Sequence, residues 1–399
     1  MNNLPNDPRA ALGLRPIINV SGTMTGLGAS IAQPEVIEAM RAILPHFVEI
    51  DALQRLASRR IARSTGAEAG YVTASSAAGI TLAVAAAMTG PDLALIEQLP
   101  DSTGMRSEVL LQMGHAVHYG APIEQGIRLA GSRVRLVGTA TLASDYQLAA
   151  AINEHTAAAV YVVSHHVVDY GQIALQRFAE ICHARKVPVI VDAASEYDLR
   201  RFIDQGADIV IYSGHKFLGG CTSGIVAGRR DFVRSMFLQN RGIGRGFKVG
   251  KESIAGTIAA LQAWEVRDHA AVRAREDATL SEWQSALAEV AGIHTTVVPD
   301  PTNNPLSRLE IRVDAGATCI SAWDLADRLA RHNPPVIVRD HEVESGHFFL
   351  DPCNLHSGQA AVVADAIRGI CMQAQKHPDA GRSIAERNAD RIRSMMDWP

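Results

Sequence analysis

The residues most able to do chemistry are a lysine and an aspartate, each placed just after a hydrophobic segment. Residues 209–212 read Ile-Val-Ile-Tyr, and Lys216 follows after three small or polar residues. Residues 187–191 read Val-Pro-Val-Ile-Val, and Asp192 follows directly. Both segments predict buried strands, and ligands of open α/β sheets bind at the carboxyl ends of such strands. We therefore expect Lys216 and Asp192 at one site; a solvated loop lysine and a helix N-cap are the plain alternatives.

A third segment adds a place for an anion. The predicted strand 70–73 leads through one alanine into Ser75, Ser76 and Ala77, which begin an alanine-rich helix. The first N–H groups of a helix lack partners within it, so such a terminus binds phosphate, although the serines could equally act as simple caps. A phosphate anchor, a strand-end carboxylate and a strand-end amine are together what pyridoxal 5'-phosphate requires.

Several segments also resemble a known family. The segment Ser213-Gly-His-Lys216 resembles the lysine segment of class V, fold-type I pyridoxal phosphate enzymes. Other segments resemble the family that contains bacterial selenocysteine synthase and D-glucosaminate-6-phosphate ammonia-lyase, and together they span nearly the whole chain. These segments are 16–23 (PIINVSGT), 53–58 (LQRLAS), 65–69 (TGAEA) and 246–252 (GFKVGKE).

The resemblance implies a role for each group. Lys216 would form the Schiff base with the cofactor and then move the substrate's α-proton, while Asp192 would keep the ring nitrogen protonated. The cofactor's phosphate would be held by Ser75, Ser76, Ala77, Ser213 and His215. The family resembles obligate dimers with active sites at the subunit interface, and Thr257, which follows the lysine strand, is our candidate for a contact with the cofactor there.

Other side chains are assigned by chemical suitability. Arginine binds a carboxylate with two parallel hydrogen bonds. Arg339 follows the predicted strand 335–338, where fold-type I enzymes commonly keep a substrate-binding arginine; a surface arginine on an edge strand is the alternative. The cofactor ring needs a stacking partner, and His115, His118 and Tyr119 are available. The sequence does not choose among them, and we assign His118 to the cofactor and Tyr119 to the substrate.

Two adjacent histidines complete the set of candidates. His165 and His166 follow the predicted strand 159–163, so they lie at the same edge of the sheet. We assign His165 to the cofactor and His166 to the substrate, although a pair of histidines in a turn is more often structural. The chain has no HExxH motif and no facial set of histidines and carboxylates, so we expect no metal site.

The order of segments predicts an α/β fold, with a large domain around a mainly parallel seven-stranded sheet and a smaller α+β domain. The family resemblance implies that this fold is the fold type I of pyridoxal phosphate enzymes. The expected strands of the large sheet are 70–73, 93–96, 134–137, 159–163, 187–191, 209–212 and 224–227, and the expected helices between them are 76–88, 122–130, 144–152 and 175–184. A helix or helix pair spans 253–290. The smaller domain has expected strands 293–298, 307–313 and 335–338 and expected helices 321–331 and 356–373.

These elements imply four parts of the chain. Residues 1–40 form an N-terminal segment that contributes to the active site and the small domain, and 41–290 form the large cofactor-binding domain. Residues 291–376 form the small domain, and 377–399 form a polar tail, either frayed or a surface helix.

Composition excludes several classes of protein. Among 399 residues, 47% are hydrophobic and 20% charged, which is enough to bury a large core. Lys plus Arg is 38 and Asp plus Glu is 42, a net charge of −4, so we expect no nucleic-acid partner. The five cysteines lack disulfide or zinc spacing, and no apolar run is long enough to span a bilayer. We expect a cytoplasmic protein without a membrane anchor.

The function favoured by these residues is a pyridoxal phosphate enzyme acting on a small amino acid or amino-sugar acid. Abstraction of the α-proton by Lys216 would be the first step, and α,β-elimination to a 2-oxo acid and ammonia the outcome for a β-hydroxy substrate. Racemisation or epimerisation is the first alternative, and aminotransfer or a selenocysteine synthase-like transfer the next. A binding protein of the same fold without turnover is the non-enzymatic alternative. We expect a homodimer or higher oligomer with shared active sites.

Overall fold

The computed structural model describes residues 7–377 and 381–398 and divides the chain into two compact units. Unit 1 comprises Met1–Ala29 and Asp268–Pro399, and unit 2 comprises Ser30–Arg267. This division differs from the expected boundaries at residues 41 and 290, because the units separate between two successive helices rather than after the second. Residues 1–6, in the expected N-terminal segment, and 378–380 and 399, in the expected tail, lie outside the described residues.

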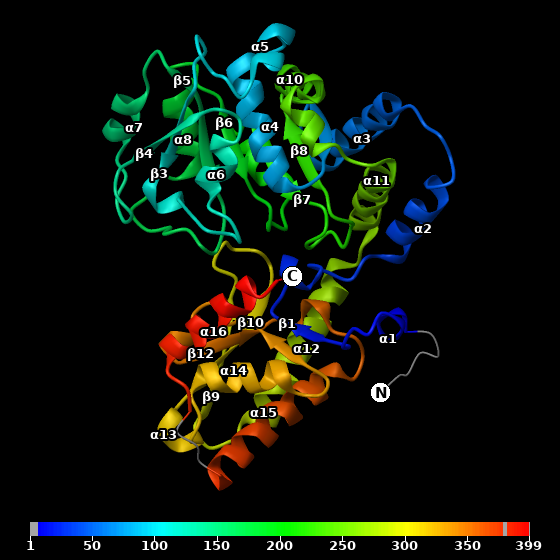
Figure 1. The fold of residues 1–399 in the computed structure, drawn as a ribbon, viewed down its shortest axis with the longest axis vertical. Coiled ribbons are helices and arrows are strands. Elements are labelled where there is room, and N and C mark those ends of the chain that lie inside the picture. Colours follow the sequence, from blue (N-terminus) through cyan, green and yellow to red (C-terminus); the bar gives the residue numbers. More distant parts are fainter. Residues whose placement is uncertain (1–6, 378–380, 399) are drawn as a thin grey trace. The chain divides into compact units, whose positions relative to one another are not determined.

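Unit 2 is built on one sheet, as the sequence predicted. In the described part of the chain, seven strands pair in the order β2-β8-β7-β6-β5-β3-β4 (Figure 1). Strand β8 runs antiparallel to both of its neighbours, and the other pairs are parallel. The strands are β2 (Ala69–Thr73), β3 (Glu108–Gln112), β4 (Arg133–Val137), β5 (Thr156–Val162), β6 (Val189–Asp192), β7 (Ile209–Ser213) and β8 (Gly224–Gly228).

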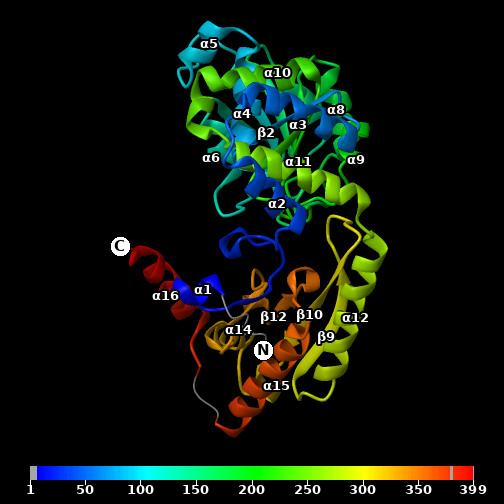
Figure 2. The ribbon, with the colours of Figure 1, turned by 90° about the vertical axis from the view of Figure 1, so that its right-hand side faces the viewer.

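Alternate residues of each strand enter one of two cores, because side chains alternate across a strand. In β7, Val210 and Tyr212 belong to one core, whereas Ile209 and Ile211 belong to the other. Helices cover both faces of the sheet (Figures 1 and 2). The first core is covered by α2 (Pro34–Ile43), α3 (Ile50–Thr65), α7 (Asp145–Ala151), α8 (Leu175–His183), α9 (Arg201–Asp204) and α11 (Lys251–Val266), and the second by α4 (Ser76–Thr89), α6 (Ile123–Arg128) and α10 (Arg230–Leu238).

One expected strand of this sheet is wrong and another was missed. The segment expected as strand 93–96 is the helix α5 (Leu93–Gln98). It is helical because the Asp92 carboxylate accepts hydrogen bonds from the N–H groups of Ala94 and Leu95 and so caps the helix. The strand that was missed is β3, which lies between β5 and β4, and all but its first residue are buried.

Within the described ranges, no helix is long and apolar enough to cross a membrane.

Unit 1 has two small sheets and its own core. Strands β9 (Ile293–Pro299), β10 (Ser307–Val313) and β12 (His347–Leu350) form an antiparallel sheet in the order β12-β10-β9. Strand β1 (Ile18–Val20) pairs in parallel with β11 (Val336–Val338). The helices are α1 (Pro8–Ala11), α12 (His269–Leu287), α13 (Ala315–Thr318), α14 (Ala322–Arg331), α15 (Gln359–Lys376) and α16 (Ile384–Met396). The buried Leu280, Trp283 and Leu287 of α12 belong to this core, which explains why α12 is not part of unit 2.

The expected polar tail contains a well-capped helix. Ser383 accepts a hydrogen bond from the N–H of Glu386, and the Glu386 carboxylate accepts one from the N–H of Ser383, which is a capping box. This reciprocal pair begins α16. Of the two alternatives left open for the tail, the surface helix is therefore the one observed.

Candidate active site

The candidate site is built on strand ends that meet at the carboxyl edge of the unit 2 sheet. Val162, the last residue of β5, pairs with Asp192, the last residue of β6. Strand β6 pairs in turn with β7. Beyond β7, Ser213 and Thr73 both pair with Gly224 of β8. The loops after β2, β5, β6 and β7 therefore leave the sheet at one edge, which is where most of the expected site residues lie.

Lys216 and Asp192 are brought together at this edge. The Lys216 ammonium donates a hydrogen bond to Ser195 Oγ, in the turn after β6. Asp192 is 7% exposed, and its Oδ1 accepts a hydrogen bond from the N–H of Ala194 at 3.1 Å. Burial raises the pKa of Asp192, whereas the positive charge of Lys216 and the Ala194 hydrogen bond lower it. The amine and the buried carboxylate are thus electrostatically coupled. Ser195 was not foreseen, since a serine in a turn carries no distinguishing signal.

The N-terminus of α4 faces the same group of loops. Ser75 is its N-cap, and Ser75 Oγ accepts a hydrogen bond from the N–H of Ala78 at 3.0 Å. Ser76 and Ala77 begin the helix and are half-buried, so their N–H groups lie among those that have no helical partner. A Cβ built on Gly224 would lie 2.3 Å from Ser75 O, so only glycine lets β8 pass this close. The capping reading of Ser75 is correct, and it leaves the anion-binding role open.

His215 carries an unsatisfied polar atom. Its Nδ1 lies 3.1 Å from Ser213 Oγ, and its backbone carbonyl accepts a hydrogen bond from Ser30 Oγ at 2.7 Å. His215 Nε2 is buried without a hydrogen-bond partner among the described residues. Burial and the neighbouring Lys216 charge lower the pKa of His215. A buried imidazole nitrogen without a partner is costly, so this atom is ready to bind a polar ligand.

These groups fit pyridoxal phosphate. The α4 terminus offers N–H groups to an anion, and His215 Nε2 offers a buried nitrogen to a polar group. A positive partner at Asp192 would offset the cost of burying that carboxylate. Lys216 supplies a primary amine beside it. The chemistry of this set of residues therefore matches the parts of the cofactor one by one.

Thr257 is connected to the loop that carries Lys216 through one other residue, Ser223. Its Oγ1 is 2.7 Å from Ser253 O and 2.9 Å from Ser223 Oγ, and the residue is buried. Ser223 connects it to the lysine loop, because Ser223 O accepts a hydrogen bond from the N–H of Gly214 at 2.9 Å. Within unit 2, Thr257 therefore supports the loop, and a direct contact with a cofactor stays a prediction.

The three candidates for stacking occupy different positions. His115 is 1% exposed, its Nδ1 accepts a hydrogen bond from the N–H of Val162, and its ring meets Tyr161 edge-on at 4.4 Å. His118 is exposed and only receives a weak contact from the N–H of Gly120 at 3.4 Å. Burial and the charge of Asp192 raise the pKa of Tyr119 to about 12. His115 is thus part of the core, which leaves His118 and Tyr119 as candidates.

His165 and His166 lie beside the end of β6. Their ring centroids are 3.8 Å apart, and the N–H of His166 donates to Ser164 Oγ. The preceding residue, Val163, donates its N–H to Asp192 O at 2.8 Å, which ties this loop to the candidate site. In the ranges described here, no group of three or more His, Cys, Asp or Glu side chains is arranged to hold a metal ion.

Arg339 belongs to unit 1 and follows strand β11. Burial and the nearby charge of Arg308 lower its pKa to about 10, while Asp351, Asp300 and Glu342 act in the opposite direction. Arg308 is already paired with both aspartates, at 2.7 Å to Asp300 and 2.9 Å to Asp351. The Arg339 guanidinium itself has no hydrogen bond or ion pair with another residue of 7–377 or 381–398. The role of Arg339 in binding a substrate carboxylate stays a prediction.

The chain resembles known proteins over most of its length. A family model described as SelA, L-seryl-tRNA selenium transferase, matches residues 17–293. D-Glucosaminate-6-phosphate ammonia lyase of Salmonella typhimurium is 39% identical over 91% of this chain and 97% of that relative. A 5'-C-glycyluridine monooxygenase-decarboxylase of a Streptomyces species is 34% identical over 88% and 89%. The solved structure of a D-glucosaminate-6-phosphate ammonia-lyase covers 92% of this chain and 99% of its own, with a TM-score of 0.84 and 38% identity.

Proposed function

The chain belongs to the SelA family, among the fold-type I enzymes that use pyridoxal 5'-phosphate, and from this premise we propose that it is a lyase that releases ammonia from a 2-amino-3-hydroxy acid. The observation that carries the proposal is the meeting of the Lys216 amine and the buried Asp192 at adjacent strand ends. The relative with 39% identity is an ammonia lyase, which favours elimination over the other reactions open to this cofactor.

The chain's own residues would hold the cofactor at three points: its phosphate, its ring nitrogen and the face of its ring. Ser75, Ser76 and Ala77 would bind its phosphate through the α4 terminus, together with Ser213 and His215. Asp192 would bind the ring nitrogen, and His118 and His165 would lie against the ring. When bound, pyridoxal phosphate supplies a positively charged ring that withdraws electrons from the substrate's α-carbon.

Lys216 would move the protons of the reaction at Nζ. Its amine is held by Ser195 Oγ, so the base is oriented before the substrate arrives. Removal of the α-proton and departure of the β-hydroxyl, which takes up a proton to leave as water, form a carbon–carbon double bond. The resulting enamine tautomerises to an imine, and one water hydrolyses it to a 2-oxo acid and ammonia. Water is therefore lost and regained, and ammonia is the net product besides the oxo acid.

The substrate would be oriented by its carboxylate. Arg339 is the described guanidinium that combines burial with the lack of a partner in its own unit, which suits a two-pronged contact with a carboxylate. Tyr119 and His166 would contact the rest of the substrate. D-Glucosaminate 6-phosphate, the substrate named for the Salmonella relative, is the first compound to test.

We also propose a cytoplasmic homodimer with shared active sites. The support is a row of exposed apolar side chains on and between α2 and α3, which a second copy would cover: Ile37, Leu44, Phe47, Ile50 and Leu56. All five cysteines are free, in keeping with a reducing compartment. Sedimentation of the purified enzyme, compared with a Phe47→Glu variant, tests the interface.

The function is tested by colour and by product. We expect the purified protein to be yellow and to lose this colour when it is treated with borohydride. The Lys216→Ala variant should bind the cofactor loosely or not at all. With D-glucosaminate 6-phosphate, and separately with D- and L-serine, ammonia and 2-oxo acid should appear in equal amounts. Exchange of the α-proton in heavy water without ammonia would instead indicate racemisation. A colourless protein that the cofactor cannot reconstitute would contradict the proposal.

A further inference from the structure

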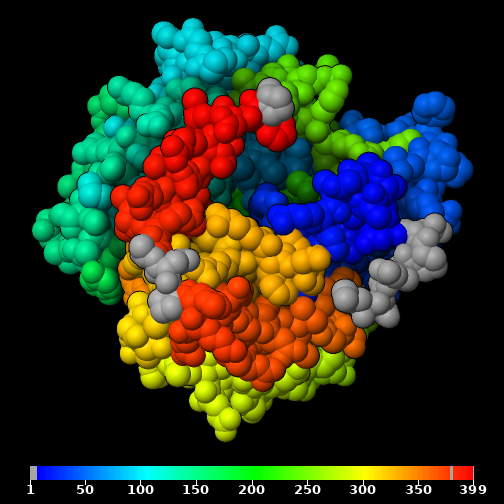
Figure 3. Space-filling view, turned by 60° about the horizontal axis from the view of Figure 1, so that its bottom comes forward, coloured from blue at the N-terminus to red at the C-terminus, as the bar shows by residue number. Residues whose placement is uncertain are grey.

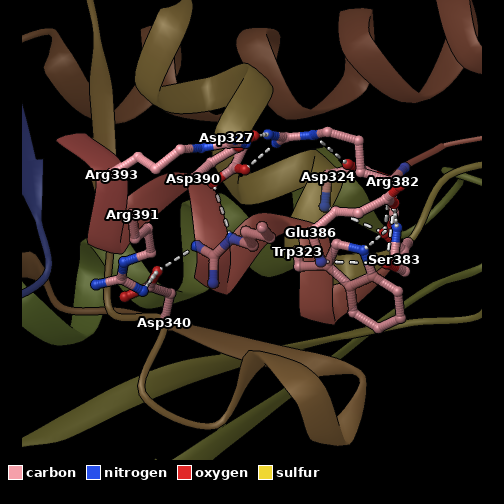
Figure 4. A network of polar contacts seen from close by, with 12 residues as sticks. Trp323, Asp324, Asp327, Asp340, Arg382, Ser383, Glu386, Asp390, Arg391 and Arg393 are labelled. Carbon is pink, nitrogen blue, oxygen red and sulfur yellow. Dashed lines mark hydrogen bonds and ion pairs between the residues drawn. The ribbon is translucent and has the colours of Figure 1, made fainter.

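The C-terminal helix α16 is attached to the rest of unit 1 through a network of arginines and aspartates (Figure 4). Arg387 is 4% exposed and lies between two carboxylates of unit 1. Its Nε donates to Asp327 Oδ1 at 3.0 Å, and its Nη2 donates to Asp340 Oδ2 at 2.6 Å. Arg391, one turn later, makes a longer contact of 3.5 Å with the same oxygen of Asp340. Two guanidinium groups of α16 therefore hold Asp340.

The position of α16 is fixed by Arg382, which directly precedes the N-cap residue of the helix. The N–H of Arg382 donates to Asp324 Oδ2 at 3.1 Å, and Trp323 Nε1 donates to Arg382 O at 2.7 Å. Arg382 also pairs with Asp327. These contacts join the start of α16 to α14, and Figure 3 shows the helix in red on the surface of the molecule. The Arg387 side chain is therefore held at a defined place and is shielded from solvent.

Asp340 is the next residue after Arg339, which gives this network a consequence for the arginine. Both residues act on His341: burial is the main cause that lowers its pKa, the charge of Arg339 lowers it further, and the charge of Asp340 raises it. A cavity of about 410 Å³, lined by Asp340, His341, Arg387 and Arg391 among others, lies beside them. The cavity leaves room for the Asp340 carboxylate to move if Arg387 and Arg391 release it, and Arg339, the adjacent residue in the chain, is a chemically suited partner.

We propose that Arg387 is a positioning residue that keeps Asp340 from pairing with Arg339. An aspartate tethered next to the arginine has a high effective concentration and would compete with any carboxylate that arrives from solution. By binding Asp340 on the side of α16, Arg387 leaves the Arg339 guanidinium available. This inference rests on the proposed role of Arg339 in binding the substrate carboxylate.

The test is a rescue experiment on the holoenzyme. Arg387→Met should raise KM for D-glucosaminate 6-phosphate about tenfold while kcat changes little, since only ground-state access to Arg339 is affected. Gluconate 6-phosphate has the carboxylate but no amine. Its Kd, measured by calorimetry, should rise by the same factor as KM. Adding Asp340→Asn to Arg387→Met removes the competitor, so KM and Kd should return toward the wild-type values. Arg393→Met, on the same helix and paired with Asp390 alone among the residues that the structure describes, is the matched control.

The outcomes separate this inference from the function on which it rests. If α16 served only to stabilise unit 1, Arg387→Met would lower the urea midpoint and leave the gluconate 6-phosphate Kd unchanged, and the inference would be overturned. If Arg339→Lys leaves both KM and the gluconate 6-phosphate Kd unchanged, the assignment of Arg339 fails instead. Should Arg387→Met lose its fold, Arg387→Gln with and without Asp340→Asn gives the same comparison, with Trp fluorescence reporting whether α16 stays attached.

Discussion

The two regions that carry the proposed site are held in place in different ways. At the edge of the unit 2 sheet, Lys216 and Asp192 are placed by the ends of two paired strands, and their supports are local turns. In unit 1, Arg308 lies between Asp300 and Asp351, and Arg387 lies between Asp327 and Asp340; of these four pairs only Arg308–Asp300 is close in sequence. Groups placed by backbone should be replaceable without loss of fold, whereas groups that neutralise buried charges should not.

The largest effect is expected from Lys216→Ala, which should break the chemistry and spare the fold. We expect kcat to fall about a thousandfold or more, because the group that moves the proton is lost. The urea midpoint should fall less than that of Arg308→Met, because Lys216 is half-buried on a loop, and the fall that remains reflects the loss of a positive charge near the buried Asp192. Lys376→Ala, at the exposed end of α15, is the control for loss of a lysine. Retained turnover in Lys216→Ala would remove this residue from the mechanism.

The Arg308→Met variant should show the opposite pattern to Lys216→Ala, because its main effect should be a loss of folding stability. Arg308 is 8% exposed, and its removal leaves Asp300 and Asp351 buried without their cation. We expect unfolding to require about 3–5 kcal/mol less free energy. Arg312→Met, whose pair with Glu310 is exposed, should cost less than about 1 kcal/mol. Equal urea midpoints for the two variants would contradict the contrast between the regions.

The sequence predicted the backbone-placed region well. The hydrophobic runs of β6 and β7 end where the structure ends them, within one or two residues, so Asp192 and Lys216 could be assigned to one edge. The family resemblance then supplied their chemistry, and the match to SelA confirms that family. Leu93–Gln98 was misjudged because its apolar residues suit a strand and only the Asp92 cap decides for a helix.

The unit 1 network could not be predicted in the same way. Arg387 and Asp340 are 47 residues apart, and no periodicity links a charge on one helix to a charge after a distant strand. Ser195 and Ser30 likewise support the site through contacts that the sequence does not mark. Side chains that act through tertiary contacts carry the same signal as solvated ones, so they become visible only when the fold is known.

His115 in unit 2 and Glu276 in unit 1 should make opposite contributions to the pH dependence of folding stability. Burial lowers the pKa of His115 in unit 2 to about 4, so folding stability should fall as the pH drops from 6.5 toward 4. Burial raises the pKa of Glu276 in unit 1 to about 7, so stability should fall as the pH rises from 4.5 toward 7. Each slope is at most about 1.4 kcal/mol per pH unit. In urea titrations at several pH values, His115→Gln should reduce only the loss of stability at low pH, and Glu276→Gln only the loss of stability as the pH rises toward 7. If the two variants showed the same dependence of stability on pH, the contrast would be refuted.

The smallest expected effects are the changes in folding stability when two glycines near the C-terminus are replaced by alanine. Gly381 has φ +63°, and a Cβ built on it would lie 2.8 Å from Asp324 Oδ2, the carboxylate that receives Arg382. Gly381→Ala should therefore cost about 1 kcal/mol, because the left-handed backbone and the contact both oppose a side chain. Gly369 lies inside α15 with nothing near its missing Cβ. Gly369→Ala should gain about 0.5–1 kcal/mol through helix propensity. Urea midpoints that move in the same direction for both would mean that the start of α16 is less constrained than its contacts imply.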